Sequence, residues 1–560
     1  MTSGPSTVLR PWLSIQAGLG IHPPTVDGAR FGARLEKQAD QIPNAVSLKY
    51  AGRDITFSEF NDAANRLANA LASLVGPGDV VGLHMPNIPQ FCFALAAISK
   101  LGAIATGVSP LLTGPEVCYQ ISDARIKVLI SFTDLAGKLT DAESLPDCLT
   151  HIVFTGALDI FDAGAHDLPE IPGVVVRAYR DLIDGHGPAF KQRDVDPEQT
   201  FVIQYTGGTT GQPKGAELSH AGISAGVEMF AASAPPPKPG KEVFASAFPM
   251  FHIAGLTLIV MCVQNGACCF LFPNARDTDA ICSAFKATPP TRLYAVPALY
   301  EMLLANPAFG DVDFRPLQLA ISGAAPLSTA TFTALEERFG KGKISEAYGM
   351  TETGGTTSNN PPARAKAGSV GMPLPGSSVI IMDPETGEGP LPIGEIGELW
   401  TSGPHIMKGY LGRPDATSGV LKVFAGSTWM RTGDIGYMDD EGYLYISDRA
   451  KDMLIVGGYK VFSVEVEDKL SSMPLIRSCA VIGSPDPRRP GNDIVHLFVE
   501  CSRVDWGKDE VAIKNGILEF CRQNLAAYKI PRMIHLIDEI PLTSVGKIDK
   551  KALRKKIGWS

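Results

Sequence analysis

The chain has 560 residues, of which 45% are hydrophobic and 19% charged, with 59 acidic against 50 basic side chains. At roughly 100–200 residues per domain this length predicts several domains, and the composition is typical of a globular protein rather than a disordered or fibrous one. The formal net charge of −9 gives no support to a nucleic-acid partner, which usually requires a strongly basic domain.

The N-terminus and the cysteines favour a cytoplasmic protein. The first twenty residues lack the basic segment and apolar core of an export signal. The longest apolar stretch near the middle of the chain, residues 256–263, is far shorter than the roughly 20 residues of a membrane-spanning helix. The ten cysteines show no C-x-x-C or Cys/His ligand spacing, so we expect reduced thiols and neither a disulfide framework nor a zinc site.

Short apolar runs alternate with helical patterns up to about residue 350. Residues 45–50 predict a strand, and the capping-box sequence TFSE at 56–59 predicts the start of a helix. Residues 80–85 predict the next strand, and a helix is expected after Pro89. This alternation predicts an α/β fold of mostly parallel sheets covered by helices.

One loop points to phosphate binding. Directly after the apolar residues 201–203, the chain reads YTGGTTGQPKG from Tyr205 to Gly215. The segment has little side-chain bulk and many accessible backbone N–H groups, with hydroxyls and an ammonium nearby, which suits phosphate oxygens. It is not a Walker loop, because the required Gly-Lys-Ser/Thr would have to begin at Gln212. Taken alone, a surface loop rich in turn residues is an equal alternative.

The composition of the sequence changes near residue 368. Glycines, prolines and short strand-like pieces predict a β-rich subdomain at 368–447 within an N-terminal domain at 1–447. We place the boundary around Ser447 to Lys451 and expect a small mobile α+β domain at 448–560. Within it we expect strands at 478–483 and 494–500 and a helix at 508–526.

Five further segments carry polar residues that have ordinary explanations when taken singly. They are SGAAPL (322–327), EAYGMTET (346–353), WMRTGD (429–434), SDRAKD (447–452) and PLTSVGKIDK (541–550). In this order, and with the loop, they resemble the adenylate-forming superfamily of acyl-CoA synthetases, peptide-synthetase adenylation domains and firefly-type luciferases. The resemblance covers nearly the whole chain. QYTGGTTG, FPMFHIAGLT and VGKIDKKALR are most similar to bacterial fatty-acyl-CoA ligases, although Gly207 stands where most members have serine.

The resemblance implies a two-step reaction with ATP, Mg²⁺ and coenzyme A. A carboxylate attacks the α-phosphorus of ATP to give acyl-AMP and pyrophosphate, and the CoA thiol then displaces AMP. Lys547 would stand between the carboxylate and the α-phosphate, Thr351 would contact that phosphate, and Glu352 with Thr206 would hold the metal. Tyr348 would face adenine, and Asp434 would bind the ribose. The implied nucleotide-binding residues are Thr206, Gly207, Gly208, Thr209, Thr210, Gly211, Lys214, Gly323, Ala324, Ala325, Glu346, Ala347, Tyr348, Gly349, Met350, Thr351, Asp434, Arg449 and Lys547.

The second step implies a rotation of the C-terminal domain about a hinge at Lys451, which brings a hairpin to the site. The implied CoA-binding residues of this hairpin are Gly457, Gly458, Tyr459 and Lys460. His252 would act as a gate beside the carboxylate, although a histidine beside Phe251 also suits a packed core position. The implied acyl pocket comprises Met229, Phe230, His252, Val296, Ser322, Gly354 and Gly355.

These pocket residues are mostly apolar or small, and no acidic residue is placed to meet an α-ammonium group. We therefore expect a hydrophobic acid, most naturally a medium- or long-chain fatty acid, rather than an amino acid. The alternatives are an aryl-CoA ligase, an acyl-AMP ligase that loads a carrier protein, and a non-catalytic adenylate sensor, which would require a broken catalytic set. Arg488 and Arg489 are expected to be solvated rather than bound to CoA. The basic end at 550–556 is compatible with contact to an anionic membrane surface. A homodimer is also compatible with the sequence.

Overall fold

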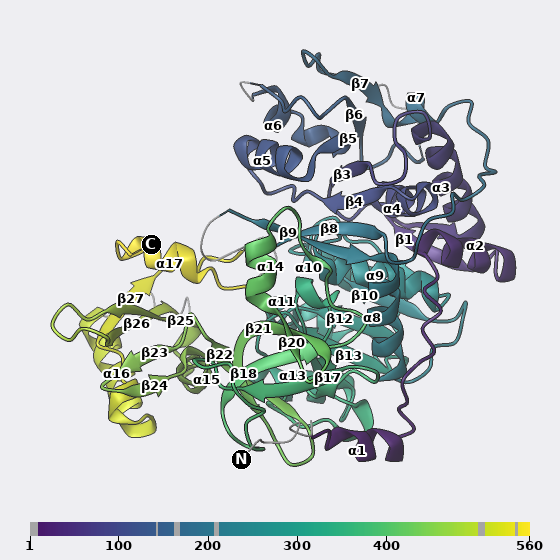
Figure 1. Cartoon of the computed structure of the whole chain (residues 1–560). Coiled ribbons are helices and arrows are strands. Elements are labelled where there is room, and N and C mark those ends of the chain that lie inside the picture. The colour runs from purple at the N-terminus through teal and green to yellow at the C-terminus, as the bar shows by residue number, and fades with distance from the viewer. Residues whose placement is uncertain are drawn as a thin grey trace.

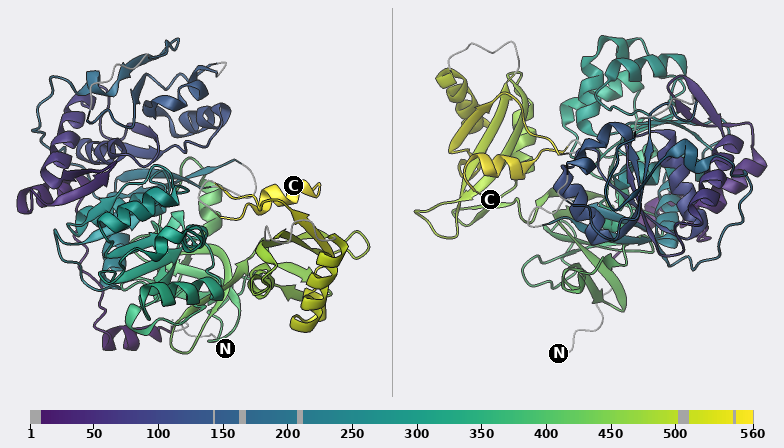
Figure 2. Two further views of the ribbon diagram at one scale, coloured as in Figure 1. Left: turned by 180° about the vertical axis from the view of Figure 1, so that it is seen from behind. Right: turned by 90° about the horizontal axis from the view of Figure 1, so that it is seen from above.

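The computed structural model describes residues 9–141, 144–161, 168–206, 212–501, 510–543 and 547–559. Two extended sheets dominate a large N-terminal part, and a smaller C-terminal part stands beside it (Figure 1). Seen from above, the C-terminal elements are set off to one side of the N-terminal mass (Figure 2). The predicted α/β fold with a large and a small domain is confirmed.

The first large sheet has the strand order β19-β9-β8-β4-β3-β5-β6-β7. Its strands are β3 (Val80–His84), β4 (Ile104–Gly107), β5 (Ile126–Phe132), β6 (His151–Thr155), β7 (Val175–Ala178), β8 (Thr200–Thr206), β9 (Lys214–Ser219) and β19 (Gly409–Tyr410). The pairs from β8 through β4 to β7 are parallel, whereas β9 pairs antiparallel with β8 and β19. The phosphate-type loop therefore joins two antiparallel strands.

The second large sheet has the order β16-β15-β14-β13-β12-β10-β11-β1-β2. Its strands are β1 (Val46–Tyr50), β2 (Arg53–Thr56), β10 (Val243–Ser246), β11 (Cys268–Phe270), β12 (Arg292–Ala295), β13 (Leu319–Gly323), β14 (Ile344–Tyr348), β15 (Ser358–Asn359) and β16 (Met372–Pro373). The centre is parallel, and the edge strands β2, β15 and β16 are antiparallel. Residues 51–52 join β1 to β2 and residues 349–357 join β14 to β15, connections too short for a parallel crossover, and the sequence pattern did not reveal these antiparallel edges.

Helices cover these sheets, and the two helices predicted to begin at 56–59 and after Pro89 are α3 (Phe57–Leu71) and α4 (Pro89–Leu101). The longer ones are α2 (Phe31–Gln41), α3, α4, α5 (Gly114–Ala124), α8 (His220–Ala232), α9 (Ile253–Gln264), α10 (Thr278–Ala287), α11 (Pro297–Ala305) and α13 (Thr329–Phe339). The predicted capping box is confirmed, because Thr56 Oγ1 accepts from Glu59 N at 3.2 Å and Thr56 N donates to Glu59 Oε2 at 2.7 Å. Helix α4 is buried on every side.

A third sheet forms the β-rich region. It contains β17 (Ser378–Met382), β18 (Gly397–Ser402), β20 (Leu421–Phe424), β21 (Ser427–Met438) and β22 (Leu444–Arg449), with the helix α14 (Pro414–Val420) beside it. All of its strand pairs are antiparallel. Strand β22 ends at Arg449, inside the range 447–451 where we predict the domain boundary. That boundary stays a prediction.

The C-terminal part has its own apolar core. It comprises the hairpin β23 (Leu454–Val456) and β24 (Tyr459–Val461), the sheet β25 (Ile476–Pro485), β26 (Asp493–Cys501) and β27 (Met533–Ile537), and the helices α15 (Ser463–Ser471), α16 (Glu510–Asn524) and α17 (Lys550–Lys556). The strands expected at 478–483 and 494–500 are β25 and β26, and the helix expected at 508–526 is α16 over its described residues.

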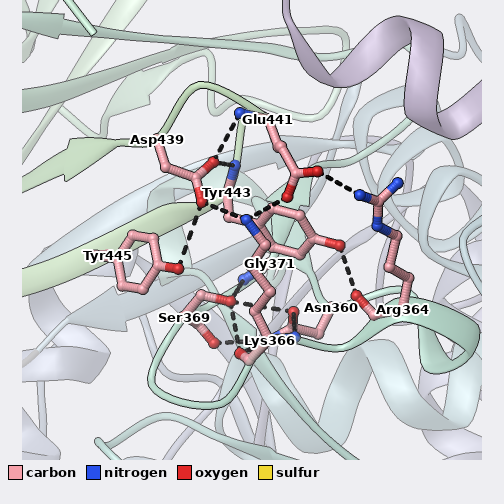
Figure 3. A network of polar contacts seen from close by, with 9 residues as sticks. All are labelled: Asn360, Arg364, Lys366, Ser369, Gly371, Asp439, Glu441, Tyr443 and Tyr445. Carbon is pink, nitrogen blue, oxygen red and sulfur yellow. Dashed lines mark hydrogen bonds and ion pairs between the residues drawn. The ribbon is translucent and has the colours of Figure 1, made fainter. Parts of the chain in front are cut away.

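A polar network fastens the segment 360–371 to the turn between β21 and β22 (Figure 3). Lys366 Nζ lies 2.6 Å from Asp439 Oδ2, forms an ion pair with Glu441, and stands 4.3 Å from the centre of the Tyr443 ring. Tyr443 donates its hydroxyl to the carbonyl of Arg364 at 2.5 Å. The network thus holds the strand pair that carries Asp434 and Arg449 against the end of the second large sheet.

We expect Lys366→Ala to lower the free energy of unfolding by about 1–3 kcal/mol, because two partly buried carboxylates then lose their shared cation. Thermal unfolding at neutral pH measures the effect, with the exposed Lys341→Ala as the matched control. Identical midpoints for the two variants would show that the network adds nothing to stability.

Candidate functional site

The adenine- and ribose-type residues meet at the carboxyl ends of the parallel strands β13 and β14. Tyr348, the last residue of β14, donates its hydroxyl to Asp434 Oδ2 at 2.5 Å. Arg449 Nε lies 3.2 Å from Asp434 Oδ1, and the register of β21 and β22 pairs these two residues. Burial raises the pKa of Tyr348, and the Asp434 carboxylate raises the pKa of Arg449, so the phenol and the guanidinium both stay donors.

The opposite wall is formed by the turn after β13. The strand ends at Gly323, one residue beyond the predicted Ser322, and a Cβ on Gly323 would lie 3.2 Å from the carbonyl oxygen of Ala347. Ala324 adopts a left-handed φ of 71°, which is uncommon for a residue other than glycine and accompanies the close approach of this turn to β14. The predicted run of small residues therefore leaves room beside Tyr348.

Glu346 is a buried carboxyl of the same strand. Its Oε1 accepts from the backbone N–H of Leu327 at 3.3 Å. Burial raises its pKa to about 7, so at neutral pH the group is divided between its acid and carboxylate forms. The Glu346 carboxyl group can therefore donate a hydrogen bond in its acid form and accept one in its carboxylate form.

Glu352 lies in the short 3₁₀ turn Thr351–Thr353, which ends at Gly354 with a left-handed φ of 59°. Its carboxylate is buried, and Oε1 accepts from the Tyr410 hydroxyl at 2.7 Å. The described residues hold no group of three or more His, Cys, Asp or Glu side chains fit for a metal. One carboxylate that relies on substrate oxygens and water for the other ligands fits Mg²⁺.

Lys547 reaches this site from the C-terminal part. Thr543 N donates to the Lys547 carbonyl at 2.7 Å. The segment that precedes α17 extends toward α14 and β9 (Figure 1). Burial lowers the pKa of Lys547 to about 8, with Arg449 acting in the same direction and Asp434 and Glu352 opposing it. The residues that the resemblance places in the first step are thus neighbours.

His252 belongs to the same neighbourhood. It is the N-cap of α9, and its Nδ1 accepts from the backbone N–H of Ala254 at 3.3 Å. Burial lowers its pKa to about 3, and the Lys547 ammonium adds to the effect. The imidazole is therefore neutral at physiological pH and stands at the border between the predicted acyl pocket and Lys547.

The phosphate-type loop is described only at its two ends. Gly207, Gly208, Thr209, Thr210 and Gly211 lie outside the described residues. Thr206 pairs with Lys214 in the β8–β9 ladder. The Lys214 ammonium stands 5.1 Å from the centre of the Tyr410 ring. Tyr205, just before the loop, donates to Asp123 Oδ2 at 2.7 Å.

Residues of the predicted acyl pocket come from several elements. Met229 and Phe230 are buried on α8, and Val296 is the N-cap of α11. Ser322 is buried with no hydrogen-bond partner for its hydroxyl among the described residues. Gly355 has a φ of 116°, and a Cβ there would lie 3.1 Å from Thr257 Oγ1 of α9. The assignment of these residues to an acyl pocket stays a prediction.

The predicted CoA hairpin lies away from Lys547. Gly457 and Gly458 form the turn between β23 and β24 with φ values of 62° and 82°. Tyr459 is 61% exposed and its ring stacks on Tyr528 at 4.7 Å. In this structure Lys547, and not the hairpin, interacts electrostatically with Asp434, Glu352 and Arg449.

Lys451, the predicted hinge, follows β22 directly. Burial lowers its pKa to about 8, and the adjacent Arg449 guanidinium acts in the same direction. Its role as a hinge stays a prediction.

The other basic candidates contribute less to a ligand site. Arg488 and Arg489 are exposed, which agrees with the expectation that they are solvated. In α17, Lys550 Nζ lies 2.9 Å from Glu467 Oε1, and Arg554 Nη2 lies 2.5 Å from Asp452 Oδ1. Because internal carboxylates bind these two cations, the helix offers a weaker surface for anionic lipid than its sequence suggests.

Further expectations concern cysteines and membrane spans. All ten cysteines are free thiols, as predicted, and Cys268 and Cys269 are buried. Among the described residues, no helix has the length and apolar character that a membrane crossing requires.

A groove of about 570 Å³ lies between β26, β27, α16 and α17 and includes none of the predicted site residues.

Sequence reasoning missed Tyr410, Asp123 and Arg413. Arg413 Nη2 donates to Asp123 Oδ1 at 2.7 Å and so supports the base of the phosphate-type loop from two elements. No local pattern marks Tyr410, because its bond to Glu352 joins residues 58 positions apart. Gly409, the residue before Tyr410, is the one local signal, because a glycine in a strand often marks a close approach of another backbone.

Comparison with known proteins gives one consistent result. A family model described as AMP-binding enzyme matches residues 35–411, and one described as AMP-binding enzyme C-terminal domain matches 465–547. A long-chain-fatty-acid–CoA ligase of Yersinia pestis is 31% identical over 95% of this chain and 96% of the relative. A feruloyl-CoA synthase of Amycolatopsis is 32% identical over 93% of this chain and 98% of the relative. The crystal structure of the anthranilate CoA ligase AuaEII with anthranoyl-AMP matches with a TM-score of 0.84 and 28% identity, over 94% of this chain and 97% of that chain.

Proposed function

The chain belongs to the AMP-binding enzyme family and is an AMP-forming acid–thiol ligase, and from this premise we propose that it joins a hydrophobic acid to coenzyme A through an acyl-AMP intermediate. One observation carries the proposal. Lys547, on the turn before α17, lies close enough to Asp434, Glu352 and Arg449 to interact with all three electrostatically. These four residues come from four separate segments and together provide a cation beside groups suited to a nucleotide.

The chemistry explains why this grouping is useful. A carboxylate oxygen is a poor leaving group, so thioester formation requires prior activation. In the proposed first step the substrate carboxylate attacks the α-phosphorus of ATP, the bond to pyrophosphate breaks, and acyl-AMP forms. Two anions must approach each other, and the Lys547 ammonium offsets their repulsion where charge develops.

The other groups position the nucleotide. Asp434 accepts from the ribose hydroxyls while Tyr348 provides a flat apolar face for the base. The loop after Thr206 and the Lys214 ammonium hold the β- and γ-phosphates. Mg²⁺, held by Glu352 and Thr206, would neutralise phosphate charge when bound.

In the proposed second step the CoA thiol attacks the acyl carbon and AMP leaves. Lys547 occupies the space that the incoming thiol needs, so the C-terminal domain must rotate about Lys451 and bring the hairpin at 457–460 to the site. In the present arrangement Lys547 interacts electrostatically with Arg449, Asp434 and Glu352, whereas the Tyr459 ring of the hairpin stacks on Tyr528, and this supports a motion of this kind.

For the acid we propose a medium- or long-chain fatty acid. Met229 and Phe230 present apolar surface, and the one carboxylate of α8, Glu228, forms an ion pair with Arg34. No carboxylate of this helix is thus left to bind an amino acid's ammonium group. The feruloyl- and anthranoyl-type relatives make aryl acids the second candidate class.

The test is a panel of fatty, aryl and amino acids supplied with ATP, Mg²⁺ and CoA, in which AMP and thioester are measured. We expect fatty acids to give the largest kcat/KM. A free phosphopantetheinyl carrier protein supplied in place of CoA distinguishes an acyl-AMP ligase from a CoA ligase. If no acid supports exchange of labelled pyrophosphate into ATP, the proposed function is wrong.

The pKa of Lys547 predicts the pH dependence of the first step. The ammonium form is required and its pKa is about 8, so kcat/KM for acyl-AMP formation should be retained below that pH and lost above it. Lys547→Arg, whose guanidinium stays charged, should lose the alkaline decline even if its maximal rate is lower. If kcat/KM for Lys547→Arg still falls above pH 8 as in the unmodified protein, a group other than Lys547 causes the decline.

A further inference from the structure

Tyr410 connects two groups of opposite charge that belong to different segments. Its hydroxyl donates to Glu352 Oε1 at 2.7 Å, and its ring centre lies 5.1 Å from the Lys214 ammonium. Burial raises the pKa of Tyr410, with Glu352 acting in the same direction, so the hydroxyl remains a donor at any physiological pH. The phenol therefore stands between a carboxylate and an ammonium.

The backbone around Tyr410 fixes this position from several sides. In the β19–β9 ladder Tyr410 is paired with Ala216, two residues beyond Lys214. Its backbone N–H donates to Thr417 Oγ1 at 2.9 Å. Met407 N, three residues earlier, donates to the carbonyl of Glu352 at 2.8 Å. One short segment thus holds both the strand that carries the lysine and the turn that carries the carboxylate.

We propose that Tyr410 is a positioning residue that keeps the Glu352 carboxylate and the Lys214 ammonium apart and aimed at opposite ends of the triphosphate. This inference rests on the proposed function. Without an intervening group, opposite charges so placed would be drawn into an ion pair. Each would then be withdrawn from its partner on the nucleotide, the carboxylate from the divalent cation and the ammonium from the phosphates. The hydroxyl orients the carboxylate, and the ring holds the ammonium by a cation–π contact.

Two substitutions separate these contacts. Tyr410→Phe removes the hydroxyl and keeps the ring, whereas Tyr410→Leu removes both. ATP binding is measured by calorimetric titration of the full-length protein without acid substrate, once with Mg²⁺ and once with EDTA. For Tyr410→Phe we expect about tenfold weaker binding with Mg²⁺ and unchanged binding in EDTA. For Tyr410→Leu we expect weaker binding under both conditions, because Lys214 is released as well.

The control is Tyr437→Phe, which removes a hydroxyl from a tyrosine that stacks on Tyr445 outside the site. Thermal unfolding of all variants is measured in parallel. A second readout is the conversion of supplied acyl-AMP to thioester, which Tyr410→Phe should leave within twofold of the unmodified protein, because that step needs no triphosphate.

The outcomes are distinct. Binding of ATP by Tyr410→Phe that is unchanged with Mg²⁺, or that weakens equally with and without it, overturns the positioning role. A protein that binds ATP normally but activates no acid contradicts the proposed function and leaves the Tyr410 result standing on its own measurement. An unmodified chain that binds no ATP overturns both.

Discussion

Replacing Lys547 with alanine is expected to slow acyl-AMP formation about 10²–10³-fold while leaving the conversion of supplied acyl-AMP to thioester nearly unchanged. One lost electrostatic contact to a developing charge costs about 3–4 kcal/mol, and each 1.4 kcal/mol corresponds to roughly a factor of ten. In the proposed mechanism the second step proceeds after Lys547 has left the site, so we expect the substitution to leave that step unaffected. The two rates are measured separately, by pyrophosphate exchange and by thioester release from synthetic acyl-AMP.

The matched control is Lys551→Ala, which removes an exposed ammonium from α17 four residues away. It should retain both rates. Equal loss of both half-reactions in Lys547→Ala, with normal thermal unfolding, would contradict the proposal that the C-terminal domain serves the two steps in different orientations.

The second large effect is expected for Asp434→Asn, which should lower kcat/KM for ATP about 10–100-fold. Asp434 is 3% exposed, accepts a hydrogen bond from the Tyr348 hydroxyl and forms an ion pair with the Arg449 guanidinium. An amide has one acceptor oxygen, so its NH₂ group must face one of these two donors. A hydrogen bond to a buried carboxylate contributes about 1.5–3 kcal/mol, and the Arg449 side chain, which is 45% exposed, regains part of its loss from water.

Asp440→Asn serves as the control, because that carboxylate is exposed in the turn after β21. The KM for ATP should rise in Asp434→Asn while the KM for the acid changes little. If both KM values change in parallel, Asp434 contributes to the fold of the site and not to ribose binding.

The local patterns of the sequence determined much of the molecule. Apolar runs at 45–50, 80–85 and 494–500 are strands, and the capping box at Thr56 begins a helix, because these signals act between residues that are close in the chain. The six motifs also identified the family, since each contains the residue types that its chemistry needs.

Tertiary structure alone decided how those residues meet. The Tyr348–Asp434 bond joins residues 86 positions apart, and the electrostatic interaction of Lys547 with the same carboxylate depends on the placement of the C-terminal part. The antiparallel edges of the sheets and the Glu352–Tyr410–Lys214 arrangement likewise have no local signal. The reason is physical: side-chain chemistry and chain periodicity are properties of short segments, whereas the distance between two distant segments depends on how whole sheets pack and on how the domains are oriented.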